Sequence, residues 1–440
     1  MLQRKLFLIL TVLLTLAAVA VSWLFSPEIY KAHVWPYILI IMGFSFFRYL
    51  FFILGSLLEG FRSHDAEGKF QQCSDDFLPR VSIIVPAYNE AAVIAKTIGH
   101  LATLNYPNYE IIVVDDGSRD NTYQIALTAA AEFSHLDIQV FTKPNGGKSE
   151  ALNYGFIRAS GALIMGVDAD SRLHTDSLTY GVQHFRFKNT GAVAGYVEID
   201  NPRNMLEDLQ QLEYMVSLNF LRKAYSFLGI VPIVPGPVGL FRREALDQVH
   251  GMTDDRKIFA EDAELSLRLI SAGWRIRSEE RMIAYTEAPS DFKSFFRQRY
   301  RWNRGTFQAL SKNFFTLINS PSHLARFLAL HLYIEVWILP LINILLVYNF
   351  IIRLLVYGEV HLFTVWMAYV FALELWMLVV VSRRQKRFLW ALCVMFWSKF
   401  FYENLLFFWR MFSLLDEWRD KRMTWDKLDR SSNLKDVTYG

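Results

Sequence analysis

The sequence has few cysteines, little net charge and a low share of charged residues. Its two cysteines among 440 residues, Cys73 and Cys393, exclude a disulfide framework and a cysteine-based metal site. Lysine plus arginine (46) exceeds aspartate plus glutamate (43) by 3, which is too small an excess to indicate nucleic-acid binding. Charged residues make up 20% and hydrophobic residues 53%, too apolar a balance for one ordinary soluble domain.

Long apolar runs gather at the two ends of the chain. They are residues 6–25, 37–58, 328–348, 362–382 and 388–415. A helix of about 20 residues crosses the hydrocarbon core of a bilayer, and only helices satisfy a lipid-exposed backbone within one segment. We therefore predict two transmembrane helices within residues 1–58 and two to three within residues 316–415.

The remaining ranges follow from this division. Residues 59–315 form one predicted cytosolic domain, and residues 416–440 form a tail. The basic segment 383–387 is expected to face the cytoplasm, which makes this a multi-pass protein of the inner membrane. A cleaved secretory signal is the alternative for residues 6–25, because Arg4 and Lys5 precede them and Ala18-Val19-Ala20 resembles a cleavage site.

Residues 59–315 alternate short apolar runs with helical periods, which is typical of an α/β domain with a mostly parallel sheet. We expect Pro86 to end the first strand, and a helix to begin at Lys148. The predicted strands are 81–85, 110–114, 136–141 and 162–167.

Acidic side chains follow three of these strands. They are Glu90, Asp115, Asp116, Asp168 and Asp170. Ligands bind beyond the carboxyl ends of the strands in such sheets, so we expect these carboxylates to share one crevice. They would repel one another unless a cation or donor groups were bound there. Turns also favour aspartate for backbone reasons, and that remains the alternative for Asp115 and Asp116.

Two short segments suggest what the crevice binds. Asp168 and Asp170 can both turn toward one hard cation, so Mg²⁺ or Mn²⁺ with a diphosphate is the expected chemistry. Residues 143–149 look like a phosphate loop, but Thr142 stands where a Walker A motif needs glycine. The glycines of this loop can still bring backbone N–H groups close to an anion, with a plain glycine turn as the alternative.

Six motifs in order resemble the family 2 glycosyltransferases. They are Val85-Pro86-Ala87-Tyr88-Asn89-Glu90, Asp115-Asp116-Gly117-Ser118, Asn145-Gly146-Gly147-Lys148, Asp168-Ala169-Asp170, Ala260-Glu261-Asp262 and Gln298-Arg299-Tyr300-Arg301-Trp302. The resemblance spans about residues 75–320. With the flanking apolar runs, the chain looks most like the membrane-embedded polysaccharide synthases, and among them poly-N-acetylglucosamine synthases. It implies a Rossmann-like GT-A domain between transmembrane helices.

The resemblance also implies roles for single residues. Asp262 would be the catalytic base, Trp302 would stack beneath the acceptor sugar, and Asp168 and Asp170 would hold the metal. The residues that would bind the donor are Glu90, Asp115, Asp116, Lys148, Asp168, Gln298 and Arg301. Residues 235–239 resemble an acceptor-lining loop of hyaluronan synthases.

Two departures from the family pattern stand out. Ala260 replaces the usual threonine before Glu-Asp, which changes a helix cap. Residues 195–200 are unlike the family's usual versions, which leaves donor selectivity open.

The expected function is inverting, processive transfer of a sugar, preferably N-acetylglucosamine, from a UDP-sugar to a growing polysaccharide that moves across the inner membrane. The expected partners are the UDP-sugar, the polysaccharide acceptor, membrane lipid and an accessory membrane subunit. UDP-glucose or alternating donors stay open. The alternatives are a transferase that adds one sugar to a lipid or short acceptor, and a transporter or receptor with a nucleotide-binding regulatory domain. The last is disfavoured because the helices are few and no repeat is visible.

Ionisable residues interrupt the apolar runs. They are Glu335, Glu374, Lys399 and Glu403. They indicate either a polar path for a nascent glycan or side chains that reach the membrane interface, and the sequence favours neither.

Overall fold

The computed structural model describes residues 35–72, 77–200, 202–253, 258–340, 360–382 and 388–419, together with positions 350, 351, 354, 355, 358 and 421. The apolar run at 6–25, its alternative as a secretory signal, the basic segment 383–387 and most of the predicted tail lie outside the described residues.

An eight-stranded sheet forms the centre of the domain, in the order β3-β2-β1-β4-β7-β6-β8-β5. Strands β1 to β4 pair in parallel and β6 pairs in parallel with β8, whereas β7 runs antiparallel to both β4 and β6. The predicted mostly parallel sheet is therefore confirmed. The strands are β1 (Val81–Ala87), β2 (Tyr109–Asp115), β3 (Ile138–Thr142), β4 (Leu163–Gly166), β5 (Arg172–Leu173), β6 (Thr190–Ile199), β7 (Gly239–Arg242) and β8 (Arg275–Thr286).

The first strand is longer than predicted. β1 continues through Pro86 to Ala87, so the prediction that Pro86 ends it was wrong. Its pairing with β4 extends only to Ile84, so at Pro86 the strand has β2 as its one ladder partner. Proline is tolerated where one side of a strand needs no hydrogen-bond donor.

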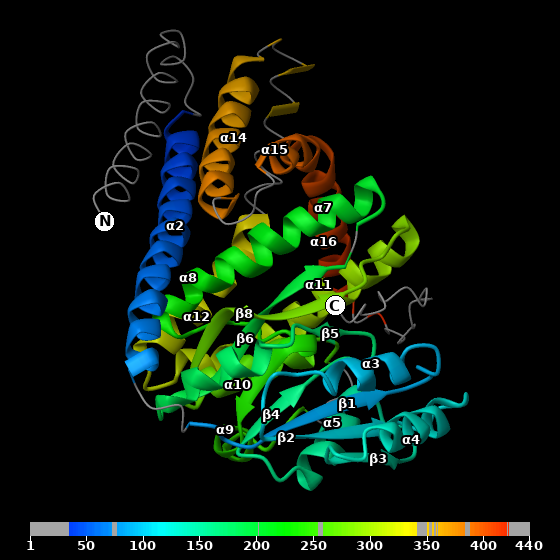
Figure 1. The fold of residues 1–440 in the computed structure, drawn as a ribbon. Coiled ribbons are helices and arrows are strands. Elements are labelled where there is room, and N and C mark those ends of the chain that lie inside the picture. The colour runs from blue at the N-terminus through cyan, green and yellow to red at the C-terminus, as the bar shows by residue number, and fades with distance from the viewer. Residues whose placement is uncertain are drawn as a thin grey trace.

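Both faces of the parallel strands are buried. Ile83 and Val85 pack into one hydrophobic cluster and Ile84 into another, because successive side chains of a strand point to opposite faces. Buried strands of this kind read in sequence as continuous apolar runs. The helices on the first face are α3 (Ile94–Leu101) and α4 (Thr122–Glu132), and those on the second are α5 (Lys148–Arg158) and α10 (Glu261–Ser271) (Figure 1).

The other helices surround this core and extend beyond it. The α-helices are α2 (Trp35–Gln72), α6 (Ser177–Gly181), α7 (Met205–Glu213), α8 (Leu221–Leu228), α9 (Arg243–Gln248), α11 (Phe292–Ile318), α12 (His323–Tyr333), α14 (His361–Ser382), α15 (Phe388–Trp397) and α16 (Glu403–Trp418). Among the residues that the structure describes, 3₁₀ turns lie at Val182–Arg186 and Gly236–Val238. π-Helical segments lie at Tyr214–Phe220, Ile334–Ile338 and Ser398–Tyr402.

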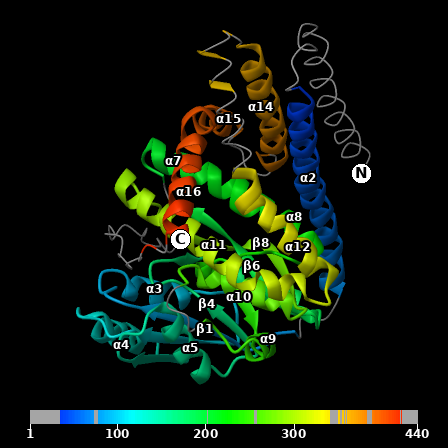
Figure 2. The ribbon, with the colours of Figure 1, turned by 180° about the vertical axis from the view of Figure 1, so that it is seen from behind.

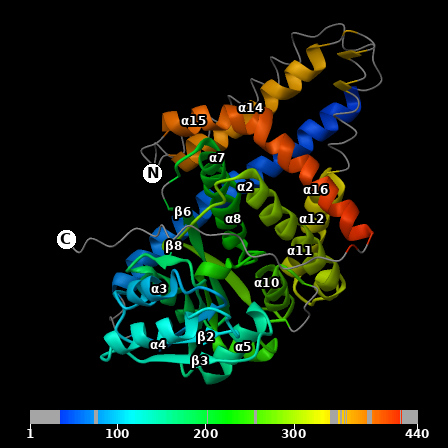
Figure 3. The same cartoon turned by 90° about the vertical axis from the view of Figure 1, so that its right-hand side faces the viewer.

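α2 and α14 stand side by side and project from the same side of the sheet domain, as Figures 1, 2 and 3 show. Within the described residues, one helical stretch is long and apolar enough to cross a membrane, at Leu39–Arg62 in α2. α14 contains a shorter apolar stretch, Phe363–Val379. A helix is therefore present over the run at 37–58, whereas its crossing of a membrane and the multi-pass arrangement stay predictions. The run at 388–415 is divided by the π-helical segment Ser398–Tyr402.

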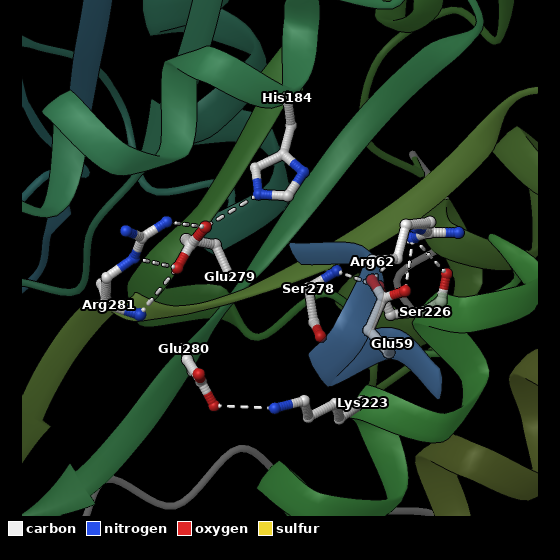
Figure 4. A network of polar contacts seen from close by, with 9 residues as sticks. All are labelled: Glu59, Arg62, His184, Lys223, Ser226, Ser278, Glu279, Glu280 and Arg281. Atoms are coloured by element: carbon white, nitrogen blue, oxygen red, sulfur yellow. Dashed lines mark hydrogen bonds and ion pairs between the residues drawn. The ribbon is translucent and has the colours of Figure 1, made fainter. Parts of the chain in front are cut away.

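The C-terminal half of α2, which contains Gly55 and Glu59, packs tightly on α8. A Cβ added to Gly55 would lie 3.1 Å from the Cβ of Ala224, so the two helices meet at a close approach. Glu59, which is buried, accepts a hydrogen bond of 2.5 Å from the Ser226 hydroxyl and forms an ion pair with Arg62 (Figure 4). The apolar helix is therefore fastened to the domain by polar contacts as well as by packing.

Strand β8 carries charged residues on both of its sides. Glu279 lies 2.9 Å from His184 Nε2 and accepts a hydrogen bond of 2.8 Å from Arg281 Nε. The next residue, Glu280, forms an ion pair of 3.1 Å with Lys223 of α8 (Figure 4). β8 thus contacts two elements through neighbouring residues: Glu279 contacts the 3₁₀ turn that contains His184, and Glu280 contacts α8.

Candidate active site

A cavity of about 1520 Å³ lies beyond the carboxyl ends of β1, β4 and β6 and continues between the C-terminal helices. Most residues predicted for the site line it. They are Glu90, Asp116, Lys148, Asp168, Asp170, Asp262, Gln298, Arg301 and Trp302. Asp115 does not line the cavity. The expectation that the acidic strand ends share one crevice is met by four of the five carboxylates.

Asp115 stabilises the turn beside the cavity. It is 3% exposed and accepts a hydrogen bond of 2.8 Å from the Thr142 hydroxyl, and its Oδ1 lies 3.3 Å from the Ser118 amide that donates to it. These contacts fit the turn-forming alternative that the sequence left open for this residue.

Asp116 holds the glycine loop. Its carboxylate accepts hydrogen bonds from the Gly146 amide (3.0 Å) and the Gly147 amide (2.7 Å), and it forms an ion pair of 2.7 Å with Lys143. The amides that we expected near a bound anion are therefore directed at a carboxylate of the chain itself. This arrangement fixes the loop from which α5 begins.

Lys148 lies among the carboxylates of the site. Gly147 precedes it with φ +95°, a conformation that favours glycine, and α5 begins at Lys148 as predicted. Its Nζ lies 2.6 Å from Asp168 Oδ1 and 3.4 Å from Glu261 Oε1. Burial alone would lower the pKa of Lys148, but the charges of Asp168 and Glu261 outweigh it and raise that pKa. The site thus holds the ammonium group of Lys148 in a fixed position, in the crevice where the sequence predicts that a diphosphate binds.

Asp262 lies in the first turn of α10, as predicted. Its Oδ1 accepts a hydrogen bond of 2.8 Å from the Ala263 amide. Burial, and secondly the charge of Glu261, raise the pKa of Asp262 to about 6, while Lys148 acts in the opposite direction. A carboxylate with this pKa is suited to accept a proton near neutral pH. Ala260 caps the helix without a side-chain hydrogen bond, in agreement with the expected change of cap.

The Gln-x-x-Arg-Trp element places three side chains on one face of α11. Gln298, Arg301 and Trp302 are spaced i, i+3 and i+4, so they are neighbours on the helix surface. The side-chain amide oxygen of Gln298, Oε1, is buried, and among the described residues no group donates a hydrogen bond to it. Buried acceptors are normally paired, so a ligand that donates here would satisfy it.

The loop at 235–239 meets the carboxylates from the opposite wall. A Cβ added to Gly236 would lie 3.0 Å from Lys148 Nζ and 3.8 Å from Asp168 Oδ2. A larger residue at this position would require the end of the Lys148 side chain to shift.

The site offers a cation two carboxylates, Asp168 and Asp170. Within the described part of the chain, no group of three or more His, Cys, Asp or Glu side chains is placed to hold a metal ion. Two carboxylates suit Mg²⁺ or Mn²⁺ that take their other ligands from a diphosphate and water. The residues present therefore fit a metal that arrives with its substrate.

Sequence reasoning missed Glu261 and Lys143. Glu261 was quoted within a motif without a role, yet it contacts Lys148 and shifts the pKa of Asp262. A signal was available, because acidic residues in the first turn of a helix interact with its N-terminal dipole. Lys143 gave no comparable signal, since its partner Asp116 is 27 positions away.

The cavity continues among the ionisable residues of the apolar helices. Lys399 forms ion pairs with Glu374 and Glu403, and the Tyr49 hydroxyl donates a hydrogen bond of 3.0 Å to Glu374. These side chains line the cavity, whereas Glu335 does not. Glu335 accepts a hydrogen bond of 2.8 Å from Arg48 of α2. These ionisable groups are thus paired with other side chains of the apolar helices.

Comparisons with known proteins place the chain in a family. Residues 79–305 match the sequence profile of the family described as Glycosyltransferase like family 2. A poly-beta-1,6-N-acetyl-D-glucosamine synthase of Staphylococcus epidermidis is 30% identical over 244 residues, which are 54% of this chain and 58% of the relative. A second synthase of that name and species is 29% identical over 299 residues, which are 66% of this chain and 69% of the relative. The match thus spans less than two thirds of the first relative.

A solved structure shares the fold. The mannosyltransferase PcManGT from Pyrobaculum calidifontis, in complex with GDP-Man and Mn²⁺, superposes with a TM-score of 0.55 at 18% identity. The superposition covers 85% of this chain and 98% of that chain. It confirms the predicted GT-A fold.

Proposed function

Because this chain belongs to the family 2 glycosyltransferases, we propose that it transfers N-acetylglucosamine from a UDP-sugar to the growing end of a polysaccharide, inverting the anomeric carbon and acting processively. The observation that carries the proposal is one cavity that holds the base Asp262, the Lys148–Asp168 pair and the aromatic face of Trp302. Similarity to two poly-beta-1,6-N-acetyl-D-glucosamine synthases supports this choice of donor and product.

Asp262 is the proposed base. It accepts the proton of the acceptor hydroxyl while that oxygen attacks the anomeric carbon from the side opposite the diphosphate. The glycosidic C–O bond forms as the bond between the anomeric carbon and the phosphate oxygen breaks, and UDP leaves with the electron pair. Lys148 and Arg301 stabilise the negative charge that grows on UDP, because fixed cations in an enclosed site need no reorganisation.

Asp168 and Asp170 are the proposed ligands of Mg²⁺ or Mn²⁺. The cation, when bound, neutralises charge on the diphosphate. Glu90 and Asp116 are the proposed contacts of the nucleoside part of the donor, and the support is that both line the cavity beyond the ends of β1 and β2. Trp302 offers its ring face to the acceptor sugar.

We also propose that the polymer leaves through the part of the cavity between the apolar helices, with the enzyme in the inner membrane. The support is that Tyr49, Glu374 and Lys399 line the same cavity as Asp262. Paired polar groups in an apolar surrounding suit a hydrated sugar chain, which carries hydroxyl groups and no charge that would need its own counter-ion.

The test measures UDP release and product length from the full-length protein in lipid vesicles. We expect UDP-N-acetylglucosamine to be the preferred donor over UDP-glucose and the other UDP-sugars of a panel, EDTA to stop the reaction, and Mg²⁺ or Mn²⁺ to restore it. Products should be long from the earliest time points. A product that stops after one added sugar would contradict processivity and favour the single-transfer alternative.

A further inference from the structure

Arg299 lies inside the Gln-x-x-Arg-Trp element, yet the family resemblance gives it no role. It is 3% exposed, and its guanidinium carbon lies 4.3 Å from the ring centroid of Trp302. Its Nε and Nη1 are buried and have no hydrogen-bond partner among the described residues. The guanidinium therefore meets the Trp302 ring where hydrogen bonds would otherwise be expected, which is the geometry of a cation–π contact.

Two further residues hold Arg299 from other elements. Its Nη2 forms an ion pair of 2.7 Å with Glu213, the last residue of α7, and lies 3.4 Å from the Tyr402 hydroxyl. The Tyr402 hydroxyl in turn donates a hydrogen bond to Glu213. We call Glu213, Arg299 and Tyr402 the triad. Its three members and Trp302 all line the cavity.

The triad connects two π-helical segments of the chain. Glu213 immediately precedes the π-helical segment Tyr214–Phe220, and Tyr402 ends the π-helical segment Ser398–Tyr402. π-helical turns are rare and are often found at functional sites. Tyr214, the first residue of its segment, also places its ring centroid 6.1 Å from that of Trp302.

We propose that the triad positions the ring of Trp302 for the acceptor sugar and links that ring to the C-terminal apolar helices. This inference rests on the proposed function. The contacts of the triad reach the ring of Trp302, so we expect the triad to govern binding of the acceptor and not of the UDP-sugar. Arg299 is a positioning residue, because it acts through Trp302.

Arg299→Lys is the decisive variant. Lysine keeps the positive charge beside Glu213 but loses the planar group that covers the indole. We expect the KM for an added β-linked N-acetylglucosamine oligosaccharide to rise about fivefold to tenfold, the size of one lost cation–π contact. The KM for UDP-N-acetylglucosamine and the slow acceptor-free hydrolysis of that donor should stay within about twofold, and products should become shorter.

Arg304→Lys is the matched control. Arg304 lies on the same helix, is also 3% exposed, forms an ion pair of 2.6 Å with Glu417 and lies 5.5 Å above the ring of Tyr300. It does not line the cavity. We expect this variant to leave both KM values unchanged. Tyr402→Phe serves if Arg299→Lys is poorly produced, and it should raise the acceptor KM with the donor KM unchanged.

The outcomes separate this inference from the proposed function. A wild-type protein that releases no UDP from any UDP-sugar would overturn the proposed function, and the inference with it. An active wild type whose Arg299→Lys and Tyr402→Phe variants keep the acceptor KM would overturn the triad alone. Equal rises of both KM values, or the same rise in Arg304→Lys, would show a purely structural role and would also overturn it.

Discussion

At the scale of single residues, Asp262 is subject to opposing influences. Burial and Glu261 disfavour its charge, whereas Lys148 favours it, and the balance is a pKa of about 6. A base acts only when it is ionised, so acceptor kcat/KM should rise with pH through about 6 and level off above it. Glu261→Gln removes a neighbouring negative charge and should move this rise to lower pH. UDP release measured across the pH range checks both expectations.

The same residue gives a second test. Asp262→Asn should reduce transfer by about 10²–10⁴-fold, the usual contribution of a positioned base, and should abolish the rise of activity with pH. The variant should unfold at the temperature of the wild type. Activity that stays within tenfold of the wild type would rule out Asp262 as the base.

Glu279 predicts how stability depends on pH. Burial alone would raise its pKa, but hydrogen bonds from His184 and Arg281 lower it to about 2, from an ordinary value of 4.5 (Figure 4). A carboxylate whose pKa is lower in the folded state stabilises the fold fully above the ordinary value, and that stability is lost as pH falls toward the folded value.

Glu279→Gln should therefore lower the free energy of unfolding at neutral pH, by on the order of 2–3 kcal/mol. The difference from wild type should shrink as the pH falls from about 4.5 toward 2. Thermal unfolding at several pH values measures it. A difference that does not change with pH would contradict this account.

At the scale of elements, the approach of α11 to α10 positions the base. A Cβ added to Gly305 would lie 2.7 Å from the Ala260 backbone nitrogen and 2.9 Å from the Phe259 carbonyl carbon. Backbone atoms cannot rotate away, so Gly305→Ala should shift α11 and the start of α10, at a cost of about 1–3 kcal/mol. Activity should fall more than tenfold, because small displacements at a reacting centre are costly.

Gly99→Ala is the control for this prediction. Gly99 is also helical, in α3, but an added Cβ would meet only the Phe133 ring, at 4.0 Å. Alanine is the better helix former, so this variant should keep its activity and its stability. A Gly305→Ala enzyme that behaves like Gly99→Ala would show that the close approach is not needed.

Some features of the strands and helices could be predicted from the sequence, and others could not. Apolar runs predicted the parallel strands because both of their faces are buried. The extent of β1 was missed, because whether Pro86 ends a strand depends on how far the neighbouring strand β4 reaches. The target of the Gly146 and Gly147 amides was missed for a related reason. Their partner Asp116 comes from another strand end, and local sequence does not reveal it.

At the scale of the whole molecule, α2 connects the apolar region to the domain. Glu59 of this helix is buried, accepts a hydrogen bond from the Ser226 hydroxyl and forms an ion pair with Arg62. Glu59→Ala leaves the Ser226 hydroxyl and the Arg62 guanidinium without this partner, so it should destabilise the protein by about 1–3 kcal/mol. Thermal unfolding in detergent measures the effect. Glu132→Ala, at the exposed end of α4, should change little, and equal effects of the two substitutions would contradict the role of Glu59.

The packing of α2 has a practical consequence for preparing the enzyme. Met42, Phe52 and Ile53 of this helix belong to the same hydrophobic cluster as Ile84 of β1 and Ala224 of α8. Cutting the chain after α2 to obtain a water-soluble catalytic fragment would remove one side of this hydrophobic cluster and expose the apolar surface of α8 to solvent. Such a fragment is expected to aggregate, so purification and crystallisation should keep α2, in a nanodisc or a mild detergent.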